Sequence, residues 1–458
     1  MKKLNIILAL ALAGFAADRN ANAQNAATNS TAWISRPLSV ADCLNIALQQ
    51  NAAILKAKND LKAQYGVVVQ TRAVALPHVT ASGQYKRVER QSIESFPSGT
   101  NGVQQPDENW NGGVQIVQTI YDGGRMIAAL RAAGATKKQA IAQYQTAEAD
   151  ALLNVRLAYY DILLAQEQIT VHEASVNLLQ KELEDQQQRY NAGTVPKFNV
   201  LRAEVAVANE RPNLIQARNQ YRIAKNNLSN LLGYNLPRDI WEDVPLNLTD
   251  ALEAAPYDVK LPDAIQQALT KRSELDALRQ AEELQKLNIV NARAGYQPTF
   301  QVFAGYGWNN SQFVDPGDLG YTLHGWNAGA QVSWDLFDGL LTHGKVVQAK
   351  ALHEKSKTDL VDQSRQIELQ VRTAYSDFIE AKEVLQSQEK VQEEAAEALR
   401  EAEARAAAGT GTQLDVLDAQ NSLTQARATQ VQALHDYDTA RARLERAIGA
   451  NMITTATK

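Results

Sequence analysis

Two carboxylates near the C-terminus have the best-defined spacing for a chemical role. Asp415 and Asp418 lie three residues apart in the segment "TGTQLDVLDAQ", at the start of a predicted helix, so both can project from one helix face. Paired carboxylates attract cations, and their mutual repulsion raises their pKa values. A structural role is the alternative, in which Thr412 caps the helix and Asp415 completes a capping box. Asp418 lies beyond the first turn, where capping does not explain it.

Other residue patterns with a chemical role are absent from the sequence. Its six histidines do not have the spacing of metal ligands, and they are His78, His172, His324, His343, His353 and His435. The segment "GTGTQL" lacks the lysine of a phosphate-binding loop, and the single cysteine, Cys43, cannot form an internal disulfide. The sequence therefore predicts neither an enzyme nor a bound metal or cofactor.

The N-terminus predicts export from the cytoplasm. Lys2 and Lys3 precede an apolar stretch from Leu4 to about Ala17, and Ala21-Asn22-Ala23 has the small residues of a cleavage site. Residues 1–23 are therefore interpreted as a signal peptide. A membrane anchor is the alternative, but the apolar stretch is shorter than the roughly 20 residues that cross a bilayer as a helix.

Composition and charge narrow the fold class and the partners. The 458-residue chain has only 12 prolines and 6% aromatic residues, and Ala, Gln, Glu and Leu dominate, which is typical of long helices. The formal net charge of −5 argues against a nucleic-acid partner, because binding phosphates needs a concentrated basic surface.

The chain is an internal duplication. Residues 121–235 align without a gap with residues 337–451, at an offset of 216. Upstream, Asp42/Asp263 and Pro77/Pro298 match at an offset of 221. The expected organisation is a signal peptide (1–23), a first repeat (24–235), a linker or equatorial segment (236–259), a second repeat (260–451) and a C-terminal tail (452–458).

The first repeat begins with a predicted helix over 39–75. In each repeat, a pair of strands with one apolar face is then predicted. Residues alternate between apolar and small or polar at about 79–121 and again at about 299–337. A β-sandwich in water is the alternative, but the chain offers nothing to cover four apolar strand faces, whereas lipid would cover them. Four strands cannot enclose a lumen, so several chains must contribute strands.

Long helices follow the strands in both repeats. The predicted helices 124–190 and 340–408 carry heptad stripes, and a helix of that size is roughly 100 Å long. Glycine-containing tips at 191–196 and 409–412 turn the chain into shorter helices, 197–233 and 413–449. The pattern predicts a cylinder wall in which long helices alternate with stacked pairs of shorter ones.

In the order of these elements, the chain resembles the TolC-type outer-membrane efflux proteins, also called outer membrane factors. The segments that carry the resemblance are "SVADCLNIALQQN", "TIYDGGR", "DLFDGL", "YNAGTVPKFNVLRAEV" and "AAAGTGTQLDVLDAQNSL". The resemblance implies a mainly α fold with a β-barrel segment. Three chains with 4 transmembrane strands each would form a 12-stranded barrel in the Gram-negative outer membrane, continuing into a long periplasmic α-helical barrel.

The resemblance also implies a function and partners. It implies a passive duct of a tripartite efflux or type I secretion system, carrying drugs, small molecules or proteins. The implied partners are a periplasmic adaptor (membrane fusion protein) and an inner-membrane pump of the RND or ABC type. A periplasmic coiled-coil adaptor or envelope scaffold without a pore is the alternative, because heptads alone fit either class.

Three groups of site residues follow from the resemblance. Asp415 and Asp418 match the pore constriction of the family, and threefold symmetry would gather them into a ring around the axis. The latch must differ from that of the best-known member, because Ala406 and Gly411 replace its Tyr and Arg. The expected adaptor contacts are Gly193, Thr194, Val195, Gly409, Thr410 and Gly411. The expected membrane-interface aromatics are Tyr85, Trp110, Tyr121, Tyr306, Trp308, Trp326, Trp334 and Phe337.

Overall fold

A computed structural model describes residues 36–89, 108–234, 244–310 and 322–450. The predicted signal peptide, the linker residues 236–243 and the C-terminal tail lie outside the described residues. The chain divides into two compact units. We call the first the helical unit (up to Lys56, Ala147–Lys271, and from Ile367 on) and the second the sheet unit (Ala57–Thr146 and Arg272–Gln366).

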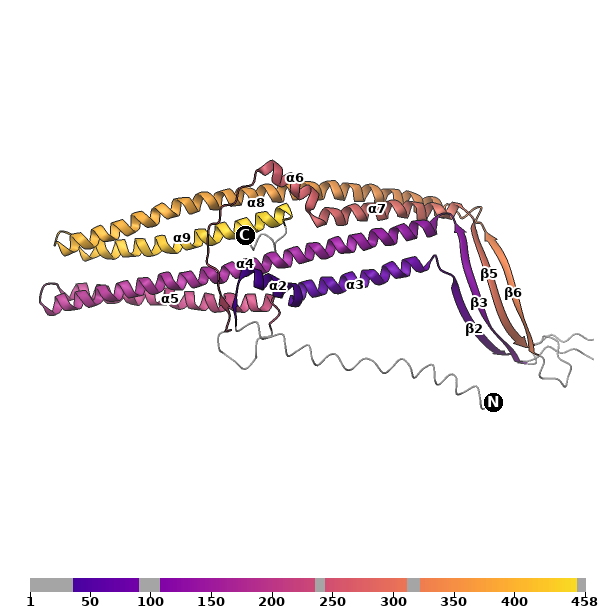
Figure 1. Ribbon diagram of the computed structural model, residues 1–458, viewed down its shortest axis with the longest axis horizontal. Coiled ribbons are helices and arrows are strands. Elements are labelled where there is room, and N and C mark those ends of the chain that lie inside the picture. Colours follow the sequence, from indigo (N-terminus) through magenta and orange to yellow (C-terminus); the bar gives the residue numbers. More distant parts are fainter. Residues whose placement is uncertain (1–35, 90–107, 235–243, 311–321, 451–458) are drawn as a thin grey trace, which may run out of the picture. The chain divides into compact units, whose positions relative to one another are not determined.

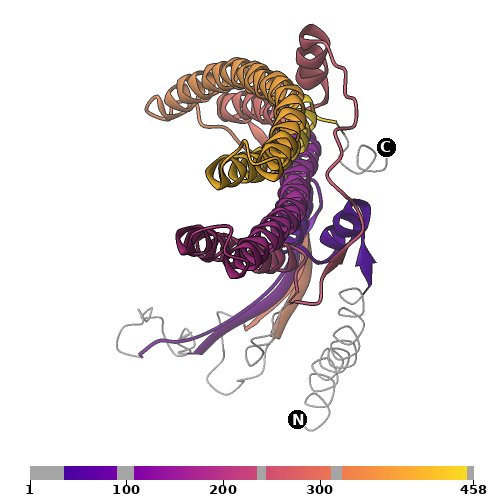
Figure 2. The same ribbon diagram turned by 90° about the vertical axis from the view of Figure 1, so that its left-hand side faces the viewer.

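The sheet unit contains one antiparallel sheet of four strands (Figures 1 and 2). The strands are β2 (His78–Arg87), β3 (Glu108–Asp122), β5 (Thr299–Asn310) and β6 (Thr322–Ser333), in the order β2-β3-β5-β6. The two strands of each repeat pair with each other, and β3 pairs with β5 to join the repeats. The sheet leaves β2 and β6 as its two edges.

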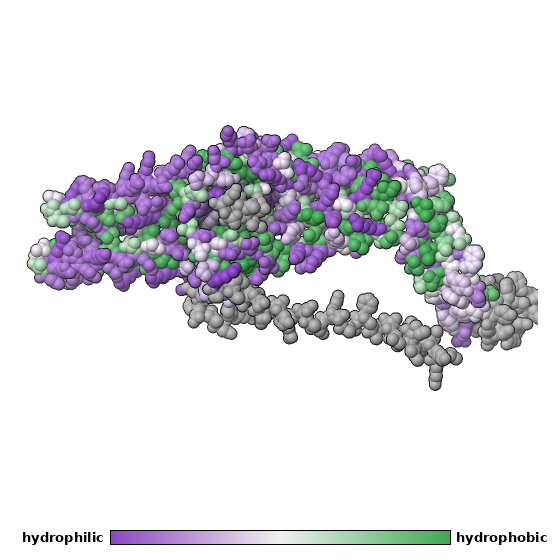
Figure 3. Space-filling view, viewed as in Figure 1, coloured by the Kyte–Doolittle hydropathy of each residue, from purple (hydrophilic) through white to green (hydrophobic). Residues whose placement is uncertain are grey.

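The strand register places the apolar residues on one face. Directly paired residues of antiparallel strands point to the same face. One such row is Ala81, Val114, Tyr306 and Trp326, and the row beside it on the opposite face is Thr80, Gln115, Gly305 and Asn327. Every residue of β2 and β6 is exposed, and Figure 3 shows hydrophobic residues over the strands. No described part of the chain covers these outer strands.

The second strand pair ends earlier than the sequence predicted. β6 stops at Ser333, which pairs with Thr299, the first residue of β5. Beyond that row no partner strand remains, so Trp334 to Phe337 lie outside the ladder. The Trp334 indole instead donates a hydrogen bond to the carbonyl oxygen of Tyr296 at 3.2 Å.

A capped corner joins each strand pair to its long helix. A carboxylate oxygen of Asp122 accepts from the Met126 amide at 3.0 Å, and one of Asp338 accepts from the Thr342 amide at 2.8 Å. Left-handed residues make the turn, with φ +69° at Gly123 and φ +66° at Gly339. The interpretation of residues 121–124 as a corner rather than a chemical site agrees with this geometry.

The long helices are α4 (Arg125–Asn191) and α8 (Leu341–Ala407), each of 67 residues. The shorter α5 (Lys197–Leu231) lies beside α4, and α9 (Gln413–Ile448) lies beside α8, which gives two hairpins (Figures 1 and 2). In the helical unit the heptad positions Val155, Ile162, Val371 and Phe378 are buried. Within the described ranges, no helix combines the length and the apolar content needed to cross a membrane.

The predicted continuous helix over 39–75 is wrong, because Asn51 divides it into α2 (Val40–Gln50) and α3 (Ala52–Ala73). Asn51 has extended backbone, with ψ 128°. Its side-chain oxygen accepts from the Ala53 amide at 2.8 Å, and its side-chain nitrogen donates to the Leu231 carbonyl at 2.7 Å. The second repeat breaks at the matching residue, Arg272, between α6 (Leu261–Lys271) and α7 (Ser273–Arg293), and the short 3-10 helix η3 (Ala294–Tyr296) follows.

The described part of the linker is tied to the helical unit. Strand β1 (Pro37–Leu38) pairs in parallel with β4 (Asn247–Leu248), a pairing that the sequence did not predict. The Tyr159 hydroxyl donates to the Leu38 carbonyl of β1 at 3.1 Å and accepts from the Asp250 amide of the linker at 3.3 Å. The Tyr437 hydroxyl donates to the Ala255 carbonyl of the linker at 2.8 Å. Side chains of α4 and α9 therefore hold the linker by its backbone.

We expect the two corner glycines to differ in their tolerance of a side chain. Both have positive φ, which costs an L-residue roughly 1–2 kcal/mol. At Gly123 a Cβ would also lie 2.8 Å from the Ala294 carbonyl oxygen, whereas at Gly339 it would meet nothing within 4 Å. Gly123→Ala should therefore lower the thermal unfolding midpoint more than Gly339→Ala does. The steric contact at Gly123 should lower the free energy of unfolding by about 1–3 kcal/mol beyond the cost of the positive φ. Circular dichroism measures both midpoints, and equal values for the two variants would contradict this geometry.

Candidate gate and docking surface at the hairpin tips

The two hairpin tips have the same turn. Gly193 and Gly409 both have φ +75°, which ends α4 and α8 with a left-handed residue. The Thr194 amide donates to the Arg189 carbonyl at 2.9 Å, and the Thr410 amide donates to the Arg405 carbonyl at 3.0 Å. A helix C-cap therefore explains the backbone of both tips. The hydroxyls of Thr194 and Thr410 take part in it, because they donate to the Arg189 carbonyl at 2.9 Å and to the Arg405 carbonyl at 3.2 Å.

The two predicted gate carboxylates have different local roles. Asp415 completes a capping box, in which its carboxylate accepts from the Thr412 amide at 2.9 Å and from the Thr412 hydroxyl at 2.8 Å. These hydrogen bonds hold the pKa of Asp415 below its ordinary value, so the raised pKa expected from the sequence is not a property of Asp415 within one chain. Asp418 is exposed one turn further along α9 and takes no part in the cap.

The missing latch residues also have a local explanation. A Cβ built on Gly411 would lie 3.0 Å from the Ala406 backbone nitrogen and 3.0 Å from the Arg405 Cβ. Such contacts are tighter than ordinary van der Waals packing, so this tip has no space for a side chain at position 411 without movement. The latch arginine of the best-known family member could therefore not be accommodated at position 411 in this conformation.

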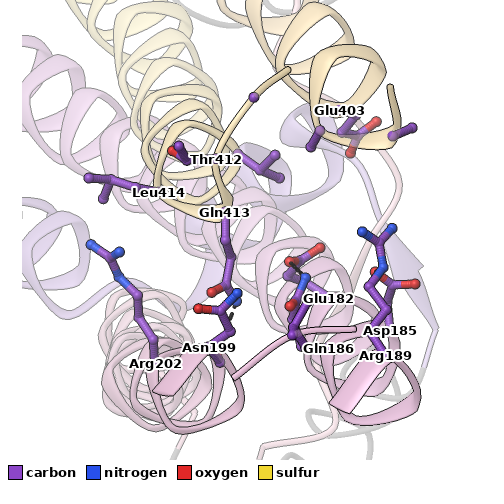
Figure 4. Close-up of a pocket in the computed structure, with 15 residues that line it drawn as sticks. Glu182, Asp185, Gln186, Arg189, Asn199, Arg202, Glu403, Thr412, Gln413 and Leu414 are labelled. Atoms are coloured by element: carbon purple, nitrogen blue, oxygen red, sulfur yellow. Dashed lines mark hydrogen bonds and ion pairs between the residues drawn. The ribbon is translucent and has the colours of Figure 1, made fainter. Parts of the chain in front are cut away.

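A cavity of about 480 Å³ lies between the two tips (Figure 4). Its charged lining residues are the carboxylates Glu182, Asp185 and Glu403 and the guanidinium groups of Arg189 and Arg202. The other lining residues are Gln186, Val195, Asn199, Ala406, Ala407, Gly411, Thr412, Gln413, Leu414 and Val416. The surface of this cavity is therefore polar and mixed in charge.

A hydrogen-bond network joins the two hairpins at this cavity. The Gln413 side chain of α9 donates to the Asn199 carbonyl of α5 at 3.1 Å and also hydrogen-bonds Glu182 of α4. Gln186 donates to Glu182 at 2.9 Å. The side-chain oxygens of Gln186 and Gln413 are buried without a partner in the described chain. Burial raises the pKa of Glu182. Its protonated carboxyl would add one donor to this acceptor-rich cluster.

Two apolar clusters fasten the same region. Leu179, Val207 and Leu417 bring α4, α5 and α9 together, and Leu399, Val416 and Leu423 join α8 to α9. The polar network thus sits beside packed side chains, where solvent screens it less. The structure holds the tip of one hairpin on the other.

Farther from the tips, ion pairs connect α4 to α9. Arg156 and Glu445 approach to 2.5 Å, with both side chains almost fully buried. Arg446 pairs with Asp150 at 2.7 Å, and His435 lies 3.0 Å from Asp161. We call these contacts, together with Thr424 and Ser175 at 3.1 Å, the α4–α9 seam.

Two titratable groups in and beside the seam, Asp438 and His435, have pKa values shifted from their ordinary ones. Burial raises the pKa of Asp438 to about 7, although Arg156 and Arg441 oppose the rise. Burial alone would lower the pKa of His435, but hydrogen bonds to Asp161 and Asp436 raise it above its usual value. Compared with the free side chains, the surroundings thus shift the pKa of His435 toward its charged form and the pKa of Asp438 toward its neutral form.

The predicted interface aromatics are all exposed and fall into two groups along the strands. In the first group, Tyr85 pairs directly with Trp110, and Tyr306 pairs directly with Trp326. Trp308 lies on the same strand as Tyr306, two residues further along, and on the same face. Tyr121 lies at the opposite end of the sheet, where it pairs with Phe300, and Trp334 and Phe337 follow the end of β6. The exposed fractions of the eight side chains run from 38% for Trp110 to 82% for Phe337.

Neither a metal site nor a reactive cysteine accompanies these features. Within the described residues, no group of three or more His, Cys, Asp or Glu side chains could hold a metal ion. Burial raises the pKa of the Cys43 thiol to about 12, which agrees with its interpretation as a small core residue.

Sequence reasoning missed the residues that join the hairpins. It did not single out Glu182, Gln186 or Gln413, nor Arg156 with Glu445. The four-residue spacing of Glu182 and Gln186 places them on one helix face, but nothing local pairs α4 with a segment more than 200 residues away. The sequence alone could have marked these positions only as polar residues within an otherwise apolar stripe.

Comparisons with known proteins agree with this architecture. The sequence profile described as "Outer membrane efflux protein" matches residues 43–234 and 264–450. Outer membrane protein TolC of Vibrio cholerae is 25% identical over 429 residues, covering 92% of each chain. The alkaline protease secretion protein AprF of Pseudomonas aeruginosa is 26% identical over 303 residues, covering 66% of this chain and 62% of the relative.

Solved channels share the fold. The outer-membrane channel OprN superposes with a TM-score of 0.74 at 20% identity, covering 90% of both chains. The open state of the MtrE outer membrane channel of Neisseria gonorrhoeae superposes with a TM-score of 0.72 at 18% identity, covering 92% of this chain and 91% of that one. The chain therefore belongs to the outer membrane efflux protein family, a family of channels rather than enzymes, in the Gram-negative outer membrane and extending into the periplasm.

Proposed function

We propose that three copies of this chain form a passive duct of a tripartite efflux or type I secretion system. The observation that carries the proposal is the sheet, which has one apolar face and two unpaired edges. Apolar residues on one face fit lipid, and polar or small residues on the other fit a water-filled lumen. We take the two groups of aromatic residues to mark the two membrane surfaces.

The edge strands explain why copies must assemble. In the order β2-β3-β5-β6 all neighbours are antiparallel, so β6 of one copy would run antiparallel to β2 of the next. Unpaired edges do not occur in lipid, because backbone groups there have no water partner. Three copies supply the 12 strands that the family resemblance implies, and a barrel of that size leaves a lumen.

The hairpins would form the periplasmic part of the duct and its end. We propose that Gly193, Thr194 and Val195, with Gly409, Thr410 and Gly411, contact a periplasmic adaptor that recruits an RND or ABC pump. The mixed charges of the tip cavity support a polar docking surface. The names of the relatives include both an efflux protein, BepC, and protease secretion proteins, AprF and PrtF, so the proposal covers both kinds of cargo.

Single-channel recording of the purified protein in planar bilayers tests the proposal directly. A trimeric duct should conduct, with small openings while its tips are closed. A trimer that never conducts, even after the tip aspartates are neutralised, would exclude the duct.

Neutralising the proposed gate ring should enlarge conductance and weaken cation block. Asp415→Asn with Asp418→Asn removes both charges and keeps an oxygen on residue 415 to accept from Thr412. We expect the concentration of a trivalent cation that gives half block to rise about tenfold or more. The matched control is Asp359→Asn with Asp362→Asn, two exposed aspartates with the same spacing on α8. Equal block in wild type and gate variant would refute the ring.

Disulfide cross-linking should locate the joint between copies at the sheet edges. Cysteine at Ser82 on β2, combined in turn with cysteine at Leu323, Asn327 or Gln331 on β6, should give dimers and trimers on denaturing gels. Such bonds form only where Cα atoms approach to about 4.4–6.8 Å. The control variant, Thr80→Cys with Gln115→Cys, joins residues paired within one chain and should stay monomeric. If none of the three β2–β6 cysteine pairs gives cross-linked dimers or trimers, the proposed assembly is contradicted.

The tip contact should strengthen in acid. The pKa of Glu182 is raised above its ordinary 4.5, so its stabilising neutral form is complete below that value and is lost as pH rises through the folded-state pKa. Hydrogen exchange of the first turn of α9, corrected for intrinsic rates, should therefore slow on acidification. Glu182→Gln should remove this dependence, and Glu184→Gln, at an exposed neighbour, should keep it. A pH response unchanged in Glu182→Gln would assign it to another group.

A further inference from the structure

A second cavity lies in the sheet unit, at the junction of strands and helices. It has a volume of about 550 Å³. The lining residues come from the start of α4, the end of α7 with η3, and the start of α8, and are Arg125, Asn288, Asn291, Ala292, Gly295, Thr342 and Lys345. Neither its location nor its residues overlap with the gate or the tips.

The charge of this cavity distinguishes it from the others. Its lining has two cationic side chains and two amides but no carboxylate. The tip cavity has three carboxylates beside two guanidinium groups, and the cavity between α8 and α9 has Asp377, Glu380 and Asp436 beside Arg443. An uncompensated pair of cations around a cavity of this size favours an anionic ligand.

The donors of this cavity are largely uncommitted. Within the described residues, neither Arg125 nor Lys345 forms an ion pair. Asn288 uses one amide hydrogen on Gln285 at 3.2 Å, which leaves its second hydrogen available. The nearby carboxylates of Asp122 and Asp338 are occupied in capping α4 and α8.

A glycine lets two of the lining segments approach each other closely. A Cβ on Gly295 would lie 2.5 Å from the Thr342 hydroxyl oxygen, so only glycine allows η3 and α8 to approach this closely. The Thr342 hydroxyl itself is engaged by Asp338 and is not counted as a donor. Arg125, Lys345 and the two asparagines are therefore the recognition groups.

The duplication provides an internal comparison. At the repeat offsets, Arg125 corresponds to Leu341, Lys345 to Ala129 and Asn288 to Val67, whereas Asn291 corresponds to Gln70, which also carries an amide. The repeat fold alone therefore does not require the two cations or Asn288. The presence of both cations at one junction only is consistent with an anionic ligand there.

The position of the cavity indicates the source of the anion. Asp122, Thr299 and Ser333 form one row at the end of β3, the start of β5 and the end of β6. Arg125 directly follows that row, and Gly295 closely precedes it. If the sheet spans the outer membrane, as the proposed function states, the cavity lies where the phosphates of the periplasmic leaflet lie.

We propose that this cavity binds a phosphate group and that the phosphate belongs to a phospholipid headgroup. Arg125 provides a bidentate fork for phosphate oxygens, Lys345 provides a point charge, and the amides of Asn288 and Asn291 provide neutral donors. The volume exceeds that of a bare phosphate and accommodates a headgroup with its glycerol. The lipid as source rests on the proposed function; the phosphate chemistry does not.

Native mass spectrometry of the detergent-solubilised protein tests the site with three probes: dihexanoyl phosphatidylethanolamine, inorganic phosphate, and dihexanoylglycerol, which lacks phosphate. Wild type should bind the phospholipid and not dihexanoylglycerol. Arg125→Gln with Lys345→Gln should weaken phospholipid binding about tenfold or more. Arg131→Gln with Lys350→Gln is the matched control, because it removes the same charge from exposed positions of α4 and α8 outside the cavity; its binding should stay within about twofold of wild type.

The outcomes separate the two proposals. Equal phospholipid binding by the two double variants, or equal binding of dihexanoylglycerol and phospholipid, overturns the site. Binding of inorganic phosphate alone, lost in the Arg125/Lys345 variant, supports the phosphate site and overturns the lipid as its source. Single-channel recording of the same preparations reports on the duct independently, since a conducting channel with unchanged lipid binding refutes only the cavity proposal.

Discussion

The rest of this architecture depends on a sheet that cannot be satisfied within one chain. Its apolar rows stay exposed, and its edge strands β2 and β6 lack an outer partner. In water such edges invite aggregation, whereas in lipid they must be paired. Within the described residues nothing covers the outer strands or pairs with the edges. The proposed membrane location and the proposed assembly of several copies therefore answer the same constraint.

The helical unit holds its two hairpins together with buried polar contacts as well as with apolar packing. Its α4–α9 seam contains the buried pair of Arg156 and Glu445. Removing one partner of such a pair typically costs about 3–5 kcal/mol, although an apolar replacement of both can be neutral. The pair therefore specifies which helix faces meet more than it adds stability. Arg372, the repeat counterpart of Arg156, instead pairs with Glu368 at the surface, where such pairs contribute little.

Sequence patterns with a local cause predicted the structure well. The strand alternation, the heptad stripes and the tip glycines each depend on neighbours a few residues away. The elements they predicted are present as β2, β3, β5, β6, α4, α8 and the turns at Gly193 and Gly409. The break at Asn51 was missed because its cause includes the Leu231 carbonyl, which is distant in sequence. The Glu182–Gln413 contact was missed for the same reason. The capping box of Asp415 was foreseen as an alternative because it needs only Thr412, three residues before it.

Duplication also explains where specific chemistry can arise in a wall built from repeated parts. Matching corners have matching carboxylates, Asp122 and Asp338, because both helices need the same cap. Neighbouring positions need not match, and Leu340 adopts φ 69° where the first repeat has Gly124, at a cost of roughly 1–2 kcal/mol. Arg125 and Lys345 have no charged counterparts at all. In the proposed assembly of three copies, two identical repeats per chain would give a wall with nearly sixfold symmetry, in which every site would occur twice per chain. Divergence between the repeats reduces that symmetry, so gate, seam and cavity can each occur once per chain.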